Sequence, residues 1–234
     1  MLNQLKKDLQ KLANSNKAKD LSRFFKTGKG QYGEGDIFLG VSVPDQRENA
    51  KKYPGLKLNE IQELLSSKIH EHRLTSLFIL ISKFEKGNNK LKKEIFDFYL
   101  QNTKNINNWD LVDLSAPKIS GAYILDNPKE KKILYKLAKS KNLWEKRIAV
   151  LSTYTLIKNN EFNDTLNISE ILLKDKHDLI HKAVGWMLRE IGKKDQKTEE
   201  KFLKQHYKKM PRTMLRYAIE KFQKNKKKFY MKKS

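Results

Sequence analysis

Residues 143–158 read LWEKRIAVLSTYTLIK, and this stretch decides the fold. Successive residues of an α-helix are about 100° apart around the axis, so Trp144, Ile148 and Leu151 fall on one face. The stretch therefore predicts an amphipathic helix that packs this face into a core. Arg147 lies within the same apolar arc. A buried guanidinium requires an anion, and either a carboxylate or a nucleic-acid phosphate would satisfy it.

Similar segments recur along the chain. Comparable openings are Arg73-Leu74, Arg147-Ile148-Ala149, Lys182-Ala183-Val184 and Thr213-Met214-Leu215. Ala149 precedes Ala183 by 34 residues, and Trp109 precedes Arg147 by 38. A recurrence of this length, with two helices per unit, is typical of HEAT-like repeats. We therefore predict an all-α fold, a HEAT-like helical repeat solenoid with a concave basic surface.

Helical spacing of apolar residues extends over most of the chain. The further predicted helices lie near 2–12, 58–66, 71–85, 90–101, 106–114, 129–139, 167–173, 178–191, 198–208 and 211–224. Gly192 is placed to end the helix at 178–191. No long linker interrupts the pattern, so we expect a single HEAT-like α-solenoid domain over residues 1–224. Residues 225–234 form a basic C-terminal tail, which we expect to be disordered in isolation.

Composition narrows the possible partners and chemistry. The chain has 50 Lys and Arg against 27 Asp and Glu, a formal charge of +23, which favours polyanions, nucleic acid first and anionic membranes second. It contains no cysteine, and its five histidines lack the flanking carboxylates of a zinc motif, so we expect no metal and no cofactor. The glycine-rich residues 28–36 lack the Gly-Lys-Ser/Thr ending of a phosphate-binding loop, so a flexible loop is expected. With no apolar run near ~20 residues and no signal-peptide pattern, a cytoplasmic protein is expected.

The first candidate site residues lie in residues 107–113, NNWDLVD. On a helix, Trp109 and Asp113 would lie about 40° apart, one turn above the other. A carboxylate among apolar neighbours needs a cationic partner or a cleft. Two interpretations remain open: a core tryptophan beside an aspartate paired with Arg147, or a site that receives something cationic.

The second candidate group lies on the helix predicted at 178–191. Its apolar stripe consists of Ile180, Val184, Met187 and Ile191. Trp186 lies about 160° from the centre of this stripe and shares its face with Lys182 and Arg189. A tryptophan on a basic face is typical of nucleic-acid surfaces, although a solenoid helix could also pack that face against the next repeat.

At these residues the sequence resembles the AlkD-like DNA alkylation repair family, alkylpurine DNA glycosylases built from HEAT-like repeats. The matching segments are Phe38-Leu39-Gly40 with Pro44 and Arg47, Trp109-Asp110-x-Val112-Asp113, Leu143-Trp144-x-x-Arg147-x-Ala149 and Lys182-Ala183-x-Gly185-Trp186-x-Leu188-Arg189-Glu190. Two departures are visible. Asn108 stands where the family would have a second aromatic residue, and the loop at 28–36 is longer than the family requires.

The resemblance implies a role for each candidate residue. Asp113 stands at the catalytic carboxylate, and Trp109 and Trp186 stand at two aromatic walls. Arg147 stands at the arginine that holds the DNA backbone. The expected DNA-binding residues are Arg147, Lys182, Arg189 and Arg47.

The implied function is a DNA glycosylase that excises 3-methyladenine and 7-methylguanine from duplex DNA in base excision repair, without flipping the lesion into a pocket. Double-stranded DNA with alkylated bases is the expected partner, with no membrane and no obligate protein partner, and we expect a monomer. Two alternatives remain: a non-catalytic nucleic-acid-binding HEAT-repeat protein, and a protein–protein adaptor, which the +23 charge disfavours.

Overall fold

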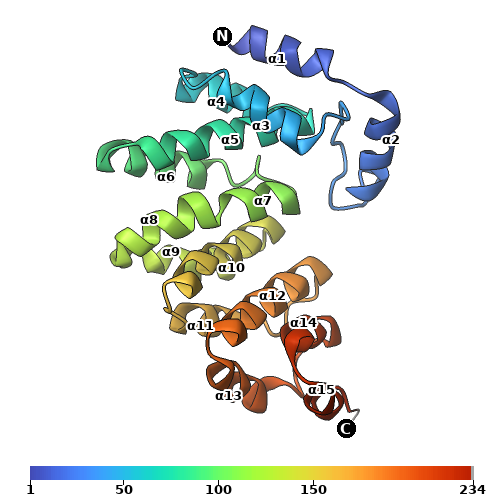
Figure 1. Ribbon diagram of the computed structural model, residues 1–234, viewed down its shortest axis with the longest axis vertical. Helices are drawn as coiled ribbons and strands as arrows, with labels where there is room; N and C mark the ends of the chain where they lie inside the picture. Colours follow the sequence, from blue (N-terminus) through green and yellow to red (C-terminus); the bar gives the residue numbers. More distant parts are fainter. Residues whose placement is uncertain (233–234) are drawn as a thin grey trace. The chain divides into compact units, whose positions relative to one another are not determined.

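The computed structural model describes residues 1–232, which form α-helices joined by loops and short helical turns (Figure 1). Within this range there is no β-strand, and Ile37 and Ile69 form an isolated parallel bridge. The predicted all-α helical repeat class is confirmed. The chain divides into two compact units, unit 1 over residues 1–115 and unit 2 from residue 116 onward. A single domain over 1–224 stays a prediction, and each unit is described by itself.

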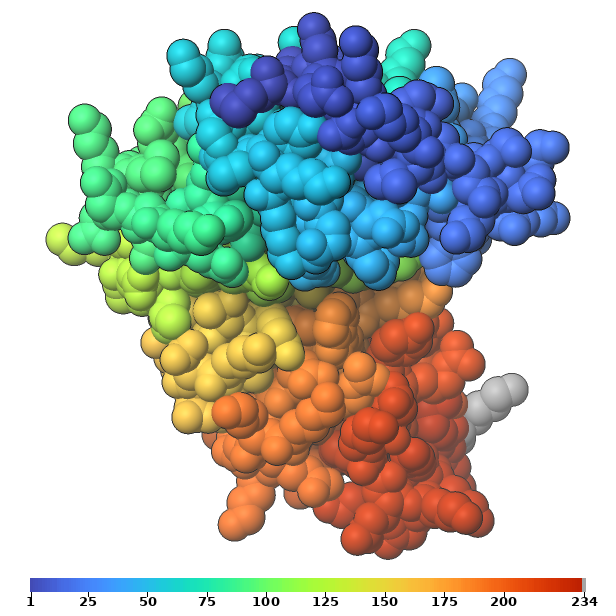
Figure 2. Space-filling model, turned by 45° about the horizontal axis from the view of Figure 1, so that its top comes forward, coloured from blue at the N-terminus to red at the C-terminus, as the bar shows by residue number. Residues whose placement is uncertain are grey.

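Unit 1 contains the first seven helices. They are α1 (Leu2–Lys11), α2 (Ser15–Phe24), α3 (Val43–Lys51), α4 (Leu58–Leu65), α5 (His70–Lys86), α6 (Asn89–Gln101) and α7 (Trp109–Ser115). The central helix is α5, which contacts α3, α4, α6 and α7. Its middle residues are apolar on every side, and Leu77 and Leu80 are fully buried. In the space-filling view, α1 covers part of α3 (Figure 2).

The segment between α2 and α3 is held by a buried carboxylate. Glu71 accepts hydrogen bonds from the backbone N–H groups of Leu39, Gly40 and Val41 at 3.0, 2.8 and 3.3 Å. Gly40 has φ +81°, and a Cβ there would lie 2.1 Å from the carbonyl oxygen of Asn14. Only glycine fits this position, which brings the segment against the start of α2.

Unit 2 contains the remaining helices and three short helical turns. They are the π-helical turn Pro117–Gly121, α8 (Ala122–Asp126), the 3₁₀ turn Pro128–Lys131, α9 (Lys132–Ala138), α10 (Leu143–Lys158), α11 (Asn163–Ile171), α12 (Asp178–Lys194), α13 (Gln196–His206), α14 (Arg212–Ala218), the 3₁₀ turn Ile219–Lys221 and α15 (Lys224–Met231). The helix predicted at 143–158 is observed with those bounds. Its core partner α12 contacts α10, α11, α13 and α14.

The C-terminal part of the chain departs from prediction at the end of α12. α12 continues through Gly192 to Lys194, so Gly192 does not end the helix. Instead it leaves room for Glu199, whose Oε2 atom would lie 1.7 Å from a Cβ at Gly192. Most of the segment predicted as a tail is helical in α15 because Tyr230 is buried and its ring lies 5.4 Å from the Tyr207 ring. Residues 233–234 of that segment lie outside the described residues.

Candidate functional site

Trp109, the first residue of α7, belongs to an aromatic stack in unit 1. Its ring stacks on Phe25 at 5.2 Å between centroids and an interplanar angle of 16°. Phe25 in turn stacks on Phe38 at 5.1 Å, and Phe38 stacks on His70 at 4.6 Å. The edge of Phe24 meets Trp109 at 5.9 Å, and Phe24 is 62% exposed. The stack fixes the plane of a half-buried tryptophan and leaves an exposed aromatic side chain beside it.

Asp113 is one helical turn after Trp109 on the same helix, as the sequence predicted. It is half-buried. Burial and the nearby charge of Asp113 together raise the pKa of Tyr99, whose hydroxyl lies 2.9 Å from Ser115 Oγ. The Asp113 carboxylate is therefore close to a tyrosine that stays protonated at neutral pH.

Four charged side chains, three of them buried and Asp110 partly exposed, form a cluster beside this stack. His70 Nδ1 lies 3.1 Å from Asp36 Oδ2, and His70 Nε2 lies 2.8 Å from Asp110 Oδ2. Arg73 Nη2 lies 2.6 Å from Asp36 Oδ2, and its Nη1 donates to the carbonyl oxygen of Ser67. We call Asp36, His70, Arg73 and Asp110 the charged cluster. It joins the loop before α3, the start of α5 and the first turn of α7.

The charged cluster shifts the pKa values of His70 and Asp36. Burial would lower the pKa of His70, but hydrogen bonds to Asp110 and Asp36 outweigh burial and raise it. Burial would raise the pKa of Asp36, but the contacts with His70 and Arg73 outweigh it and lower it. Both shifts favour the charged forms, so His70 and Asp36 stabilise each other as ions.

Asn108, the residue before Trp109, has a structural role. It is fully buried, and its Oδ1 accepts a hydrogen bond from the Trp109 N–H at 2.8 Å. Its carbonyl oxygen accepts from the Val112 N–H at 3.2 Å. Asn108 thus begins α7 with its own side chain, which an aromatic residue could not do.

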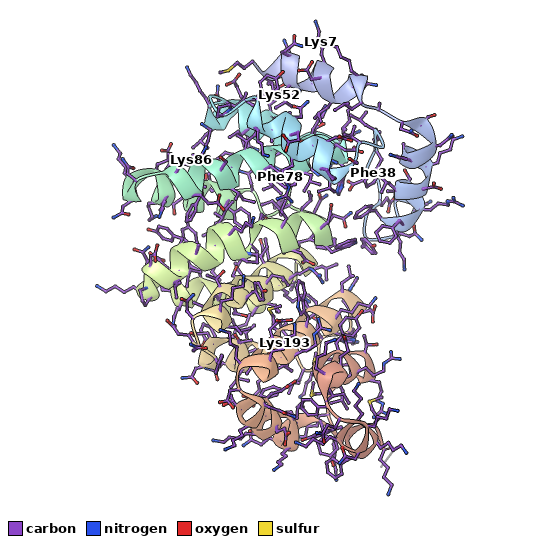
Figure 3. The ribbon with its side chains drawn as sticks, in the orientation of Figure 1. Lys7, Phe38, Lys52, Phe78, Lys86 and Lys193 are labelled. Atoms are coloured by element: carbon purple, nitrogen blue, oxygen red, sulfur yellow. The ribbon has the colours of Figure 1, made fainter. Side chains whose placement is uncertain are left out.

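Arg47, predicted to bind DNA, is exposed on α3. Its guanidinium carbon lies 4.5 Å from the ring centroid of Phe78 on α5, a cation–π contact (Figure 3 labels Phe78). The contact holds the planar group of Arg47 and leaves its edge able to donate hydrogen bonds.

The remaining predicted residues lie in unit 2, around α12. Arg147 on α10 is 5% exposed, and its Nη1 donates to the carbonyl oxygen of Leu179 at 2.6 Å. The structure therefore brings Arg147 to the first turn of α12, the helix that carries Lys182, Trp186 and Arg189.

Trp186 is half-buried, not fully exposed on a basic face. Its Nε1 donates to Glu190 Oε1 at 3.0 Å, and its ring lies 6.1 Å from that of Tyr154 on α10. Gly185 is buried as well, because α12 packs on two sides. Trp186 therefore packs against the neighbouring helix and still reaches solvent, and its place in a nucleic-acid surface stays a prediction.

The predicted DNA-binding cations of α12, Lys182 and Arg189, are paired with carboxylates. Lys182 Nζ lies 2.6 Å from Asp178, and Arg189 pairs with Glu220 and lies 3.8 Å from Glu190. An open groove of about 480 Å³ adjoins them, lined by Asp178, Lys182, Thr213, Arg216, Tyr217 and Glu220. A DNA phosphate that used these cations would compete with the carboxylates for them.

Unit 1 has a groove of its own, of about 800 Å³, lined in part by Lys19, Ser22, Arg23, Asp36, Ile37 and Phe38. Asp36 lines this groove, and Phe25 stacks on Trp109. The sequence pattern connects neither side chain with Trp109. An aromatic pair at positions 24 and 25 was visible in the sequence, but nothing local indicated that it would contact Trp109.

In residues 1–232, no group of three or more His, Asp or Glu side chains is arranged to hold a metal ion. No helix of the described chain is both long and apolar enough to cross a membrane.

The fold and these residues define an all-α helical repeat protein with a Trp-Asp pair on a short helix. The family model for the DNA alkylation repair enzyme matches residues 5–222. The chain therefore belongs to the DNA alkylation repair enzyme family, in agreement with the AlkD-like resemblance. A comparison with curated proteins finds no match.

Solved structures of similar fold come from two bacteria. A predicted DNA alkylation repair enzyme from Enterococcus faecalis is 18% identical, with a TM-score of 0.72 and coverage of 91% of this chain and 97% of that chain. AlkD2 from Streptococcus mutans is 18% identical, with a TM-score of 0.59 and coverage of 89% and 98%. The protein smu.31 from Streptococcus mutans UA159 is 20% identical, with a TM-score of 0.57 and coverage of 88% and 98%. At these identities the likeness concerns the fold.

Proposed function

We propose that this protein is a DNA N-glycosylase that removes cationic alkylated purines, 3-methyladenine and 7-methylguanine, from duplex DNA in base excision repair. Asp113 is the catalytic carboxylate, and Trp109 and Trp186 are aromatic contacts for the lesion. The DNA is held by Arg147, Lys182, Arg189 and Arg47. It lies on the concave basic surface that we predict from the sequence. The protein acts as a monomer, without a cofactor or an obligate protein partner.

One observation carries the proposal. Trp109 is held face to face with Phe25 at 5.2 Å, and Asp113 follows one turn later on the same seven-residue helix. A rigid indole and a carboxylate on one helical face form a pair suited to a cation. The half-buried position of Asp113 reduces the screening of its charge by water.

The chemistry follows from the charge of the lesion. Alkylation at N3 or N7 gives the purine a positive charge and makes it a good leaving group. Cleavage of the glycosidic bond leaves an oxocarbenium-like sugar, and a fixed carboxylate stabilises that cation or positions the water that traps it. Indole faces stabilise cationic sugars and bases through cation–π contacts.

Incubation with methylated duplex DNA tests the proposal. We expect release of free 3-methyladenine and 7-methylguanine, and no release from unmodified duplex. Binding to duplex without release of either base would favour the alternative, a non-catalytic nucleic-acid-binding HEAT-repeat protein. Lack of salt-sensitive binding to any duplex would favour a protein–protein adaptor.

A further inference from the structure

The charged cluster is built around a histidine whose two ring nitrogens both face carboxylates. His70 is 2% exposed, with Asp36 at 3.1 Å on one side and Asp110 at 2.8 Å on the other. A neutral imidazole carries one N–H and can donate to only one of them. Both contacts are hydrogen bonds only when His70 is an imidazolium. With Arg73, the cluster then contains two cations and two anions.

Asp110 links this cluster to the candidate site, because it directly follows Trp109 in the first turn of α7. A helix of seven residues is marginal on its own, so contacts with its surroundings determine its position. The ring of His70 also stacks on Phe38. Its centroid lies 5.1 Å from that of the Phe25 ring, which stacks on Trp109. His70 therefore contacts the first turn of α7 through Asp110 and the stack on Trp109 through Phe25.

The loop at residues 28–36 places Asp36 against His70. Gly30 and Gly35 adopt φ of +76° and +85°, so the loop uses conformations that other residues rarely adopt. It ends at Asp36, whose side chain is 5% exposed. The loop thus delivers the second carboxylate to His70. Asn108 Nδ2 lies 3.5 Å from the same carboxylate.

We infer that His70 is a positioning residue for α7: the imidazolium, held between Asp36 and Asp110, sets the place of Trp109 and Asp113. This inference rests on the proposed function for its kinetic consequences. When His70 loses a proton, one of its two carboxylate contacts is lost and the first turn of α7 loosens. The rate of base release should therefore fall as pH rises through the titration of His70, while affinity for duplex changes little. The groups that face His70 are Asp36 from the loop, Asp110 from α7 and Arg73 from its own helix.

The decisive variant is Asp110→Asn, studied by single-turnover base release between pH 5.5 and about 9. The amide keeps the shape of the side chain and removes one of the two anions. The pH at which release declines should move down by about 1 to 3 units, the usual effect of losing one neighbouring opposite charge. An unchanged pH profile would overturn the inference.

His70→Gln provides the second test, with His72→Gln as its matched control. His70→Gln should lower the rate of release by about 10²-fold, the effect of a misplacement of about 1 Å, and abolish the alkaline decline. Its dissociation constant for undamaged duplex should stay within about twofold of wild type, because the His70 side chain is 2% exposed and the remaining excess of positive charge attracts the duplex. A wild-type rate in His70→Gln would overturn the inference.

The control histidine is on the same helix but outside the charged cluster. His72 is 7% exposed and bonds to Ser67 Oγ at 3.0 Å. Burial and the nearby Lys6 and Arg73 lower its pKa to about 4, so it is neutral at the pH of the assay. His72→Gln should keep the wild-type pH profile. If it abolishes the alkaline decline as His70→Gln does, the assignment to His70 is wrong.

A measurement that does not depend on base release separates this inference from the proposed function. It also tests the inference if His70→Gln fails to fold. Nitrogen NMR of the wild-type protein should show both ring nitrogens of His70 protonated, with a titration midpoint above the ~6.5 of an ordinary histidine. Above that midpoint, the amides of Val112 and Asp113 in α7 should exchange faster with solvent. This result without any base release would overturn the proposed function and keep the inference. A titration midpoint of His70 at or below ~6.5 would overturn the inference. So would amide exchange rates in α7 that do not change at that midpoint.

Discussion

Asp113 is the residue whose substitution separates a catalytic from a structural role. Asp113→Asn keeps the size of the side chain and removes its charge. If the carboxylate stabilises a cationic transition state, single-turnover release should fall by about 10²–10³, the usual loss for one preorganised electrostatic group. The melting temperature should stay near wild type, and affinity for undamaged duplex should be equal or higher because a negative charge is gone.

The structural alternative makes the opposite forecast for the same protein. If Asp113 serves only as the partner of Arg147, the amide should lower the melting temperature and leave release near wild type. Asp97→Asn is the matched control, since the Asp97 side chain is 44% exposed and pairs with Lys93 in the middle of α6. It should change neither measurement.

Burial shifts the pH at which the Glu199 carboxyl ionises. It is 1% exposed, and burial with the nearby charge of Glu200 raises its pKa to about 9, against an opposing effect of Arg189. A folded-state pKa above the unfolded value of 4.5 means that its contribution to stability is full below that value. The contribution is then lost as pH rises through about 9.

Glu199→Gln should therefore flatten the dependence of stability on pH. The variant should gain melting temperature relative to wild type as pH rises from about 5 to 9, because the folded wild type must keep a proton that the unfolded chain releases. Thermal melts across that range measure the difference. Glu63→Gln, on an exposed glutamate paired with Lys6, should follow the wild-type curve. A parallel pair of curves for Glu199→Gln would contradict the prediction.

At the scale of elements, the packing of α12 on α14 depends on one residue without a side chain. A Cβ at Gly185 would lie 2.4 Å from the carbonyl oxygen of Met214 and 2.5 Å from Tyr217 Cβ. Gly185→Ala should therefore push the helices apart and lower the free energy of unfolding by about 1–3 kcal/mol, as overpacking does. Denaturant titration measures it.

Gly55→Ala is the control for this prediction. A Cβ there would meet the end of the flexible Met1 side chain, at 3.1 Å from Cε. Because that side chain can move, the stability should change little. Equal stabilities for the two variants would show that α12 and α14 separate without strain.

The helices themselves could be predicted, because their signal is local. The apolar faces of 143–158 and 178–191 repeat every three or four residues, and the observed helices cover 143–158 and 178–194. The end of α12 was missed because the space at Gly192 is set by Glu199 from the next helix. A glycine next to a predicted end resembles a helix stop unless that neighbour is known.

The candidate site was predicted in part, for the same reason. Trp109 and Asp113 share one helix, so their spacing was sufficient to pair them. Phe25, Asp36 and His70 come from other elements, and no spacing rule connects them with Trp109. The spacing of His70 and His72 raised only the question of a metal site. The contacts of His70 depend on Asp36 and Asp110, which are distant from it in the sequence.

At the scale of the whole molecule, the charge of +23 predicts binding to undamaged duplex that weakens with salt. Each neutralised phosphate contact should flatten the slope of log affinity against log salt by about one unit. Lys182→Gln should show this change, whereas Lys86→Gln, at the exposed end of α5 (Figure 3), should keep the wild-type slope. Filter binding or fluorescence anisotropy at several salt concentrations measures both. Binding that ignores ionic strength would contradict the prediction.

The stack of Phe25 on Trp109 joins positions 84 residues apart in the chain. Neighbouring helices such as α4 and α5 can pair by closing a short loop. The contact between Phe25 and Trp109 closes a much longer loop, whose entropic cost is larger, so we expect it to form later. Substitutions in the stack, such as Phe25→Leu, should accordingly speed unfolding in stopped-flow experiments and leave the refolding rate nearly unchanged. The aromatic side chains of the candidate site would then be the last part of unit 1 to assemble and the first to come apart.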